Sequence, residues 1–420
     1  MKPSHRVVLL LIALTCALPV TRADASNEPI QLRRSGSYGP FCGFVAWDPS
    51  YSSDVEHIEV HAGLSRGFEP GDSTLVYRTT SPADTFAAFA GLMAGTRYYV
   101  KVVIVSHAGR LTSSEPLDFV TGPLPPQGYA PVAEFGGRGT SPGRLFGPTG
   151  VAVDELRNYW VSDFKNNRVE KFTPSGYGFV TFGSTGTADG SFQGPAGIAL
   201  DGHGNVWVSD SRNARVQRFT TEGAWIRSVG TMGAGEGQFR LPQGLAVDQS
   251  GYLYVADPGN RAVQKFSPDG GYLQRFARPP VQDATQYGPT AVAVDPAGFV
   301  YVTDARNHCV HVFTTEGRYL KSWGGPGCGP GQFWMPSGVC VDSRGLVYVT
   351  DTGNNRIQKF NRQGDLQAQW GYRGSAPGQL TTPLGVAVAE NGTVYVADFD
   401  NDRIQLFAQP TAPDGASSNK

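Results

Sequence analysis

The hydrophobic and polar positions of residues 130–409 recur with a step of 47 residues, as from Pro148 to Pro195. Each repeat holds four short apolar runs separated by polar or Gly-containing turns, a pattern that predicts four β-strands. One proline per repeat keeps the step, at positions 148, 195, 242, 289, 336 and 383. Six repeats of this length, with four strands each, predict a six-bladed β-propeller.

The first strand of each repeat carries small residues on one side. Gly stands at positions 150, 197, 244, 338 and 385, and Ala stands at 291. Inner strands of a propeller crowd together near the axis, so small residues are expected there. Cys340 occupies a position that is Ala in the other repeats, and we interpret it as a space-filling residue rather than a reactive thiol.

The two ends of the repeat region complement each other. The sixth repeat stops after its third strand, RIQLF at 403–407, and has no outer strand of its own. The segment PVAEFGG at 131–137 matches the outer-strand pattern, because Phe135 lies one repeat length before Phe182. We therefore expect residues 131–137 to complete the last blade, which closes the propeller and removes two exposed strand edges.

The chain before the repeats has a different pattern. Residues 29–121 alternate apolar and polar positions over short runs, such as HIEVHAG at 57–63, which predicts a β-sandwich. A Pro-rich linker at 122–129 separates this domain from the propeller at 130–409. The last residues, 410–420, are expected to be a disordered tail.

Composition and charge narrow the classes of function. The chain has 54 Gly, 30 Pro and 17% charged residues, which favours an all-β protein with many turns. Its 35 basic and 36 acidic residues balance, so neither nucleic acid nor an anionic membrane surface is indicated as a partner. No run beyond the N-terminus is long enough for a membrane span.

The N-terminus has the features of an export signal. Lys2 and Arg6 precede the apolar run VVLLLIALTCALPV at 7–20, and Ala23-Asp24-Ala25 offers a cleavage site. Residues 1–25 are therefore predicted to be a cleaved signal peptide, and the protein is expected to be secreted, periplasmic or at the cell surface. Export leaves four cysteines, and the sequence leaves open whether Cys309 and Cys328 form a disulfide.

A polar loop recurs in every repeat. The stretch DTGNNRIQKF at 351–360 has near copies beginning at positions 163, 210, 257, 304 and 398. Its Asp ends the second strand and its Arg begins the third, so an Asx turn and an Asp–Arg bridge would hold the loop. We interpret this motif as structural. Ala262 and Cys309 replace the Arg in the third and fourth repeats, and such departures are where function can reside.

Two resemblances to known families follow from these motifs. The stretch PSGVCVDSRGLVYVTDTGNNRIQKFNRQG at 336–364 resembles the NHL repeat family, which implies a propeller fold but spans enzymes, RNA-binding modules and interaction proteins. Residues 91–122 resemble the second half of a fibronectin type III domain. In that resemblance Tyr98 corresponds to the corner tyrosine of the family and Trp47 to its core tryptophan.

The enzyme hypothesis finds little support. NHL-like peptidyl-amidating lyases hold zinc with His placed directly after the first Pro of several repeats. The corresponding residues here are Thr149, Ala196, Gln243, Thr290, Ser337 and Leu384. No catalytic residue, metal ligand or cofactor is therefore predicted. A lyase or a lactonase-like hydrolase acting on a small extracytoplasmic substrate stays open as the alternative.

The prediction favours an exported, non-enzymatic binding or scaffold protein. The loops between second and third strands share one propeller face with the connections between repeats, whereas the other turns are short. Exposed aromatic residues beside cations on this face suit a protein or carbohydrate partner, unless the aromatics only pack beneath the loops. The predicted binding residues are Phe146, Lys165, Arg212, Tyr287, Arg306, His308, Trp334 and Phe399.

Overall fold

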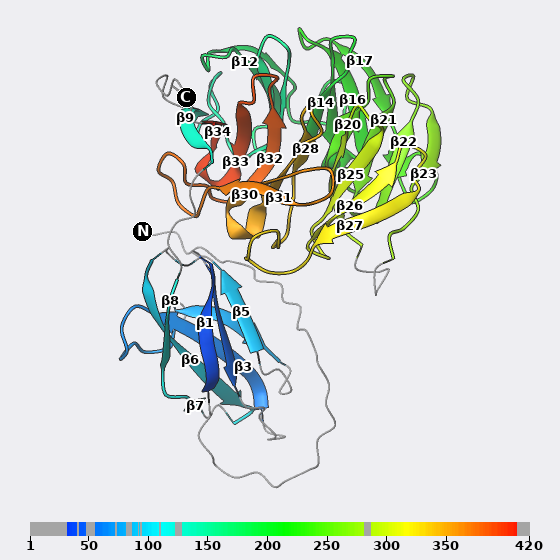
Figure 1. Ribbon diagram of the computed structural model, residues 1–420. Helices are drawn as coiled ribbons and strands as arrows, with labels where there is room; N and C mark the ends of the chain where they lie inside the picture. The colour runs from blue at the N-terminus through cyan, green and yellow to red at the C-terminus, as the bar shows by residue number, and fades with distance from the viewer. Residues whose placement is uncertain are drawn as a thin grey trace, which may run out of the picture. The chain divides into compact units, whose positions relative to one another are not determined.

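The computed structural model places the chain in two compact units, Met1–Pro125 and Pro126–Lys420 (Figure 1). Within the residues that the structure describes, both units are built of strands, the second also contains short 3-10 turns, and no α-helix occurs. The predicted signal peptide and tail, and most of the linker, lie outside these residues. The structure describes residues 32–39, 42–47, 55–71, 74–80, 86–90, 92, 95–108, 111–121, 128–280 and 287–409.

Two antiparallel sheets form the first unit. One sheet contains β1 (Leu32–Gly39), β2 (Cys42–Trp47) and β5 (Phe86–Ala90). The other contains β3 (Val55–Gly63), β4 (Leu75–Thr79), β6 (Arg97–Ser106), β7 (Leu111–Ser113) and β8 (Leu117–Val120). Residues of both sheets share one core, in which Trp47 of β2 and Val60 of β3 are buried. Tyr98 of β6 is buried as well and stacks on Phe119 of β8.

The second unit contains six four-stranded sheets, which follow one another in chain order in Figure 1. Sheet 1 consists of β10 (Pro148–Val153), β11 (Tyr159–Asp163), β12 (Arg168–Phe172) and β13 (Gly178–Phe182). Sheet 2 consists of β14 (Pro195–Leu200), β15 (Asn205–Asp210), β16 (Arg215–Thr220) and β17 (Trp225–Val229). Sheet 3 consists of β20 (Leu245–Val247), β21 (Leu253–Asp257), β22 (Ala262–Phe266) and β23 (Tyr272–Arg275).

Sheet 4 consists of β24 (Pro289–Val294), β25 (Phe299–Asp304), β26 (Cys309–Thr314) and β27 (Tyr319–Gly324). Sheet 5 consists of β28 (Val339–Val341), β29 (Val347–Asp351), β30 (Arg356–Phe360) and β31 (Leu366–Trp370). Sheet 6 consists of β32 (Pro383–Val388), β33 (Val394–Asp398), β34 (Arg403–Ala408) and β9 (Ala130–Gly136). The short strands β18 (Thr231–Met232) and β19 (Gln238–Phe239) pair with each other. The 3-10 turns η1 (Ser211–Asn213), η3 (Thr352–Asn354) and η4 (Phe399–Asn401) follow second strands.

The core of this unit lies between neighbouring sheets. Trp160 and Phe182 of sheet 1, for example, pack with Ile198, Val206 and Phe219 of sheet 2. Strands that are covered on both faces read as nearly continuous apolar runs, and each buried Val, Ile or Phe contributes about 1.5–3 kcal/mol. Because every sheet supplies one face to each neighbour, no sheet buries its apolar residues alone.

The inner strands of neighbouring sheets approach closely. A Cβ added at Gly150 of β10 would collide with the carbonyl oxygen of Ala196 in β14. A Cβ added at Gly385 of β32 would likewise collide with the carbonyl oxygen of Thr149 in β10, so sheet 6 packs on sheet 1. The small residues of the first strands are therefore required by backbone proximity.

The outer strand of sheet 6 comes from the beginning of the repeat region. β9 pairs antiparallel with β34, with Phe135 opposite Ile404 and Glu134 opposite Gln405. Figure 1 shows the cyan β9 beside the red β34 although the two strands are far apart in the sequence. The pairing expected between residues 131–137 and 403–407 is present.

The recurring polar loop forms a buried hydrogen-bonded network. In sheet 5, Asp351 accepts hydrogen bonds from Arg356 Nε at 2.7 Å and from the backbone N–H of Trp334 at 2.7 Å. The guanidinium of Arg356 also donates to the carbonyl oxygens of Gly329 and Gln332 in the preceding connection. The motif thus joins two strands to the connection that enters the sheet, which confirms its structural interpretation.

The cysteines resolve one question that the sequence left open. Cys309 is a free thiol and Cys328 is disulfide-bonded, so these two residues do not pair with each other. Cys340 is also free, and burial raises the pKa of its thiol. No helical segment of the described part of the chain has the length and apolarity to cross a bilayer.

Candidate functional site

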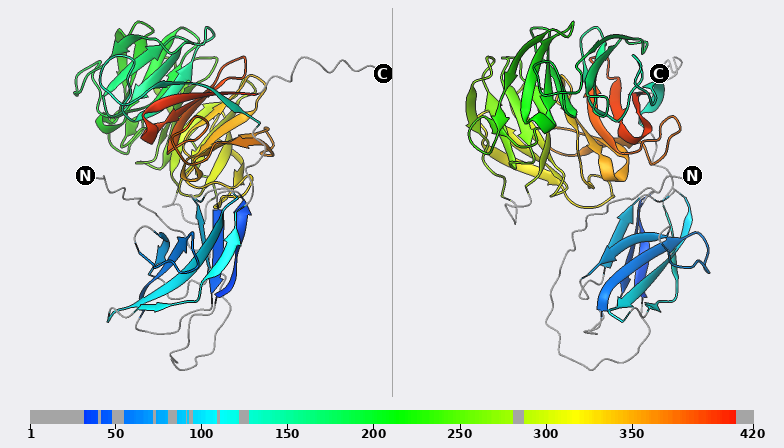
Figure 2. Two further views of the ribbon diagram at one scale, coloured as in Figure 1. Left: turned by 90° about the vertical axis from the view of Figure 1, so that its left-hand side faces the viewer. Right: turned by 180° about the vertical axis from the view of Figure 1, so that it is seen from behind.

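Because the strands of each sheet are antiparallel, their connections lie at two opposite ends of the sheets in the second unit (Figure 2). The loop end carries the loops between second and third strands together with the connections between sheets. The turn end carries the tight hairpins between first and second strands and between third and fourth strands. The predicted binding residues lie at the loop end, whereas a pocket described below lies at the turn end.

At the loop end, the structure brings three predicted binding residues together. Lys165 Nζ lies 4.6 Å from the ring centroid of Phe146 and 4.6 Å from that of Phe399. Phe399 belongs to sheet 6, whereas the other two residues belong to sheet 1. Arg138 stacks on Phe146, 4.7 Å from its ring centroid. Lys165 is exposed and both phenylalanines are half-buried, so this cluster is partly accessible.

Three further predicted residues keep separate contacts at the loop end. The guanidinium of Arg212 lies 5.0 Å from the ring centroid of Phe164. Trp334 stacks on His308, with ring centroids 4.6 Å apart. Arg212 is exposed and Trp334 is half-buried, and the exposed Arg306 lies on the loop that precedes β26. The predicted residues therefore occupy one face without forming one continuous cluster.

Two of the predicted binding residues are buried, which corrects their expected exposure. Tyr287 is only 2% exposed and His308 only 4% exposed. Burial lowers the pKa of His308 to about 4, so this imidazole is neutral at physiological pH. Its Nδ1 accepts a hydrogen bond from the backbone N–H of Met335 at 2.9 Å. Through this bond His308 supports the loop that carries Trp334.

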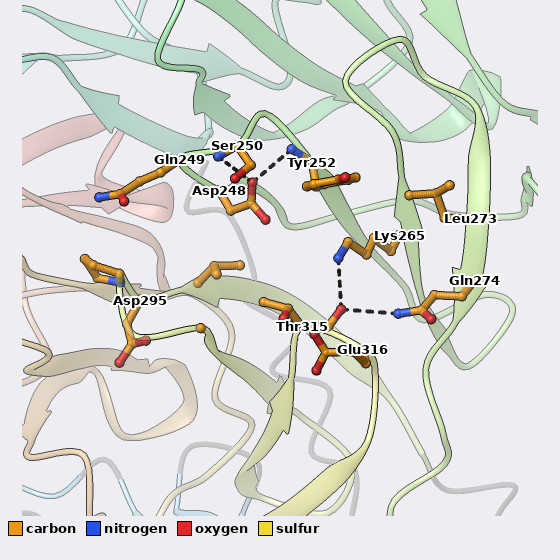
Figure 3. A pocket seen from close by; sticks show the side chains of 13 residues that line it. Asp248, Gln249, Ser250, Tyr252, Lys265, Leu273, Gln274, Asp295, Thr315 and Glu316 are labelled. Carbon is orange, nitrogen blue, oxygen red and sulfur yellow. Dashed lines mark hydrogen bonds between the residues drawn. The ribbon is translucent and has the colours of Figure 1, made fainter.

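A pocket with a volume of about 510 Å³ opens at the turn end between sheets 3 and 4 (Figure 3). It is lined by the hairpins at 248–252 and 295–298, by Thr315 and Glu316, and by Lys265 and Gln274 of sheet 3. Sequence reasoning did not predict this pocket, because it placed binding at the loop end.

A short side chain, Thr315, lies at the rim of the pocket on sheet 4. In the next interface, between sheets 4 and 5, Arg362 reaches across and donates from Nε to Asp295 Oδ2 at 2.9 Å. One repeat earlier the corresponding residue is Thr315, which lines the pocket instead. Its hydroxyl donates to Glu316 at 2.8 Å. The difference in side-chain length between Thr315 and Arg362, at equivalent positions of neighbouring repeats, is the feature of the sequence that bears on this cavity.

The carboxylates of the pocket are all engaged in hydrogen bonds. Asp248 accepts from the backbone N–H of Ser250 at 2.9 Å and from the hydroxyl of Tyr254 at 2.9 Å. Asp295 holds the equivalent turn through the N–H of Ala297 at 2.9 Å, in addition to its bond from Arg362. The hydrogen bond from Thr315 lowers the pKa of Glu316. Each of the three carboxylates therefore accepts at least one hydrogen bond from a neighbouring group.

Lys265 crosses one side of the pocket. Its Nζ donates to the carbonyl oxygen of Thr315 at 3.0 Å and lies 4.4 Å from the ring centroid of Tyr252. Gln274 Nε2 donates to the same carbonyl oxygen at 3.2 Å, as Figure 3 shows. The pocket thus combines an aromatic ring, one cation and several amide and carboxylate groups, an arrangement suited to a ligand with many hydroxyl groups.

Two of the residues that follow the first proline of a repeat, Thr149 and Thr290, bond to the neighbouring repeat. Thr149 Oγ1 donates to the carbonyl oxygen of Pro195 at 3.0 Å, and Thr290 Oγ1 donates to that of Pro336 at 3.1 Å. Metal-ligating side chains instead gather at one place in the described part of the chain, where Asp304, Cys309 and His311 face one another.

The repeats and sheets described above define a β-propeller. The protein-family model for the NHL repeat matches five segments of the chain, 147–172, 192–219, 287–313, 333–360 and 380–407. The five segments lie in sheets 1, 2, 4, 5 and 6, and sheet 3 is the one without a match. The chain therefore carries NHL repeats, in agreement with the resemblance found in its sequence.

Solved structures resemble the chain at low sequence identity. A structural genomics protein of unknown function from Bacteroides thetaiotaomicron has a TM-score of 0.51 and 14% identity, covering 91% of this chain and 99% of that chain. Virginiamycin B lyase from Staphylococcus aureus has a TM-score of 0.47 and 14% identity, covering 62% and 94%. The WD40 β-propeller domain of Doa1 has a TM-score of 0.47 and 10% identity, covering 68% and 98%. The last two likenesses are too distant to bear on function. No curated protein matches the chain significantly.

Proposed function

We propose that the chain is an exported binding protein whose turn-end pocket recognises an extracytoplasmic carbohydrate. In this proposal the six sheets are the blades of one closed propeller, residues 29–121 form a fibronectin III-like module, and residues 1–25 direct export. The lining of the pocket is the observation that carries the proposal, because it offers both hydrogen-bond donors and acceptors beside an aromatic ring.

The hydrogen bonds that the pocket carboxylates make favour binding over catalysis. A general acid needs a carboxyl group whose pKa is raised toward neutrality, and a general base needs a free lone pair near the substrate. Asp248 and Asp295 instead hold the turns on which they stand, as Asp201 and Asp342 do in sheets 2 and 5. Recurrence in several sheets supports a structural role for these carboxylates.

The size of the pocket also supports a small polar ligand. A volume of about 510 Å³ lies within the usual range of ligand sites, which is about 300–1,000 Å³. Sugar hydroxyl groups both donate and accept hydrogen bonds, so they can meet Gln249, Gln274 and the pocket carboxylates together. A sugar residue at the end of a longer glycan is the occupant that we infer.

A glycan array probed with the exported chain tests the proposal. Thr315→Arg should fill the pocket with the side chain that already crosses the next interface at Arg362, and binding should be lost. The matched control is Thr221→Arg, because Thr221 occupies the same position in sheet 2 and also donates to the neighbouring glutamate, at 2.7 Å.

The two variants separate the possible results. Glycan binding by the wild type and by Thr221→Arg, with loss in Thr315→Arg, supports the proposal. Binding that survives in Thr315→Arg rejects the pocket, and the absence of any glycan ligand rejects carbohydrate as the partner class. Chemical conversion of a bound glycan would establish the enzyme alternative. Recovery of a chain beginning at Ser26 from the extracytoplasmic fraction tests export.

A further inference from the structure

Sheet 4 departs from the recurring Asp–Arg network in a way that introduces metal ligands. The Arg that begins the third strand in four repeats, as Arg215 does in sheet 2, is Cys309 here. Two residues later, Gln stands in four repeats and His311 stands in this one. Sheet 3 also lacks the Arg, which is Ala262 there, but retains Gln264. Both ligand-type replacements therefore coincide in one repeat.

The three side chains have the spacing of a coordination shell. His311 Nε2 lies 3.1 Å from Asp304 Oδ2 and 3.5 Å from Cys309 Sγ, and all three ligand atoms lie within 4.8 Å of one another. Two ligands of a tetrahedral zinc ion are separated by about 3.3–3.6 Å, given metal–ligand bonds of about 2.0–2.3 Å. Asp304 and His311 are buried, and Cys309 is partly buried.

A buried tyrosine without a hydrogen-bond partner points to the same place. Among the described residues, the hydroxyl of Tyr287 has no partner although the side chain is fully buried. Its ring centroid lies 5.7 Å from that of His311. An unpaired hydroxyl in a buried position is unfavourable unless a ligand engages it.

Charge balance favours a divalent cation. In sheets 1, 2, 5 and 6 an arginine neutralises the buried aspartate, as Arg403 neutralises Asp398. In sheet 4 that arginine is replaced by Cys309, so Asp304 has no arginine beside it in this motif. Binding of a divalent ion with release of the thiol proton to solvent would give two negative ligands and two positive charges, and the network would again be neutral.

We propose that Asp304, Cys309 and His311 bind a divalent transition-metal ion such as Zn²⁺, with Tyr287 beside the fourth coordination position. Thiolate, imidazole and carboxylate are the ligand set that zinc uses in proteins. The ion would take the place of the arginine and fasten β25, β26 and the segment before β24. This site is remote from the turn-end pocket, and the inference is independent of the proposed function.

Cobalt titration of the chelator-treated exported chain tests this site, because Co²⁺ reports thiolate coordination through its charge-transfer absorption. We expect one Co²⁺ per chain, displaced by Zn²⁺, with a thiolate band. His311→Gln and Cys309→Ser should both abolish binding. His311→Gln introduces the residue found at this position in sheets 2, 3, 5 and 6, so it should fold normally, which circular dichroism checks. Cys340→Ser, which removes the other free thiol, should bind as the wild type does.

The proposal is overturned by any of three results. The wild type could fail to bind the metal stoichiometrically, it could bind without a thiolate band, or binding could persist in both His311→Gln and Cys309→Ser. A second readout is the midpoint of thermal unfolding, which Zn²⁺ should raise in the wild type and in Cys340→Ser but not in His311→Gln.

Discussion

Replacing Glu170 by Gln should stabilise the protein in a strongly pH-dependent way. Glu170 lies on β12 with its side chain buried, at the position where sheets 2, 3, 5 and 6 have Gln. Burial raises the pKa of Glu170 to about 7, and the charges of Arg168 and Asp163 act on it in opposite directions. Its Oε2 accepts one hydrogen bond, from the backbone N–H of Gly143 at 2.8 Å.

The sign and size of the effect follow from this raised pKa. In the unfolded chain the glutamate has its ordinary pKa of 4.5, so the folded protein holds the proton more tightly. The favourable contribution of protonated Glu170 is complete below pH 4.5 and is lost as the pH rises through about 7. The difference between the two pKa values corresponds to about 3 kcal/mol in the free energy of unfolding.

A glutamine has no such dependence and can make the bonds already seen in sheet 2. There Gln217 Oε1 accepts from the N–H of Gly190 at 3.0 Å, and Nε2 donates to the carbonyl oxygen of Ser191 at 2.8 Å. We therefore expect Glu170→Gln to exceed the wild type in stability by about 3 kcal/mol at about pH 8, and by little at about pH 5.

Urea unfolding followed by circular dichroism at both pH values measures this difference. The matched control is Gln217→Glu. Its free energy of unfolding should fall below that of the wild type as the pH rises, whereas that of Glu170→Gln should exceed it. Equal pH profiles for the wild type and Glu170→Gln would refute the reasoning, as would a variant that is less stable at the higher pH.

Three further predictions concern the propeller as a whole. Arg356→Met should lower the free energy of unfolding by about 3–5 kcal/mol, measured in urea, because it leaves a buried carboxylate without its cation. Gly385→Ala should lower it by about 1–3 kcal/mol through backbone collision, whereas Gly202→Ala, with open space around the new Cβ, should not. The double variant Arg306→Ala/Trp334→Ala should leave glycan binding unchanged on the array, since both residues lie at the loop end, and weakened binding there would return recognition to that end.

The strand pattern and the pairing of β9 with β34 could be predicted from the sequence, because both depend only on the place of a residue within the repeat. A constant repeat length fixes which residues are equivalent, and alternation fixes which face is buried. Phe135 could therefore be matched to its partner strand without coordinates. The structural role of the Asp–Arg motif followed for the same reason, because a motif shared by repeats serves the scaffold.

The site was less predictable because it depends on differences between equivalent positions. Tyr287 and His308 were predicted as binding residues from their place in loops, yet the structure buries both side chains. Thr315 lines the turn-end pocket, whereas Arg362 at the equivalent position reaches across the next interface to Asp295. Side-chain reach between sheets is a three-dimensional property, and periodicity does not encode it.

The pairing of β9 with β34 has a consequence for biosynthesis. The ribosome makes β9 before the strands of sheets 1 to 5, whereas its partner β34 is made after them. Until then an apolar edge stays unsatisfied, and joining the ends requires a contact of very high sequence separation, which slows folding. Sheet 6 can therefore be assembled only after the strands of sheets 1 to 5 have been synthesised.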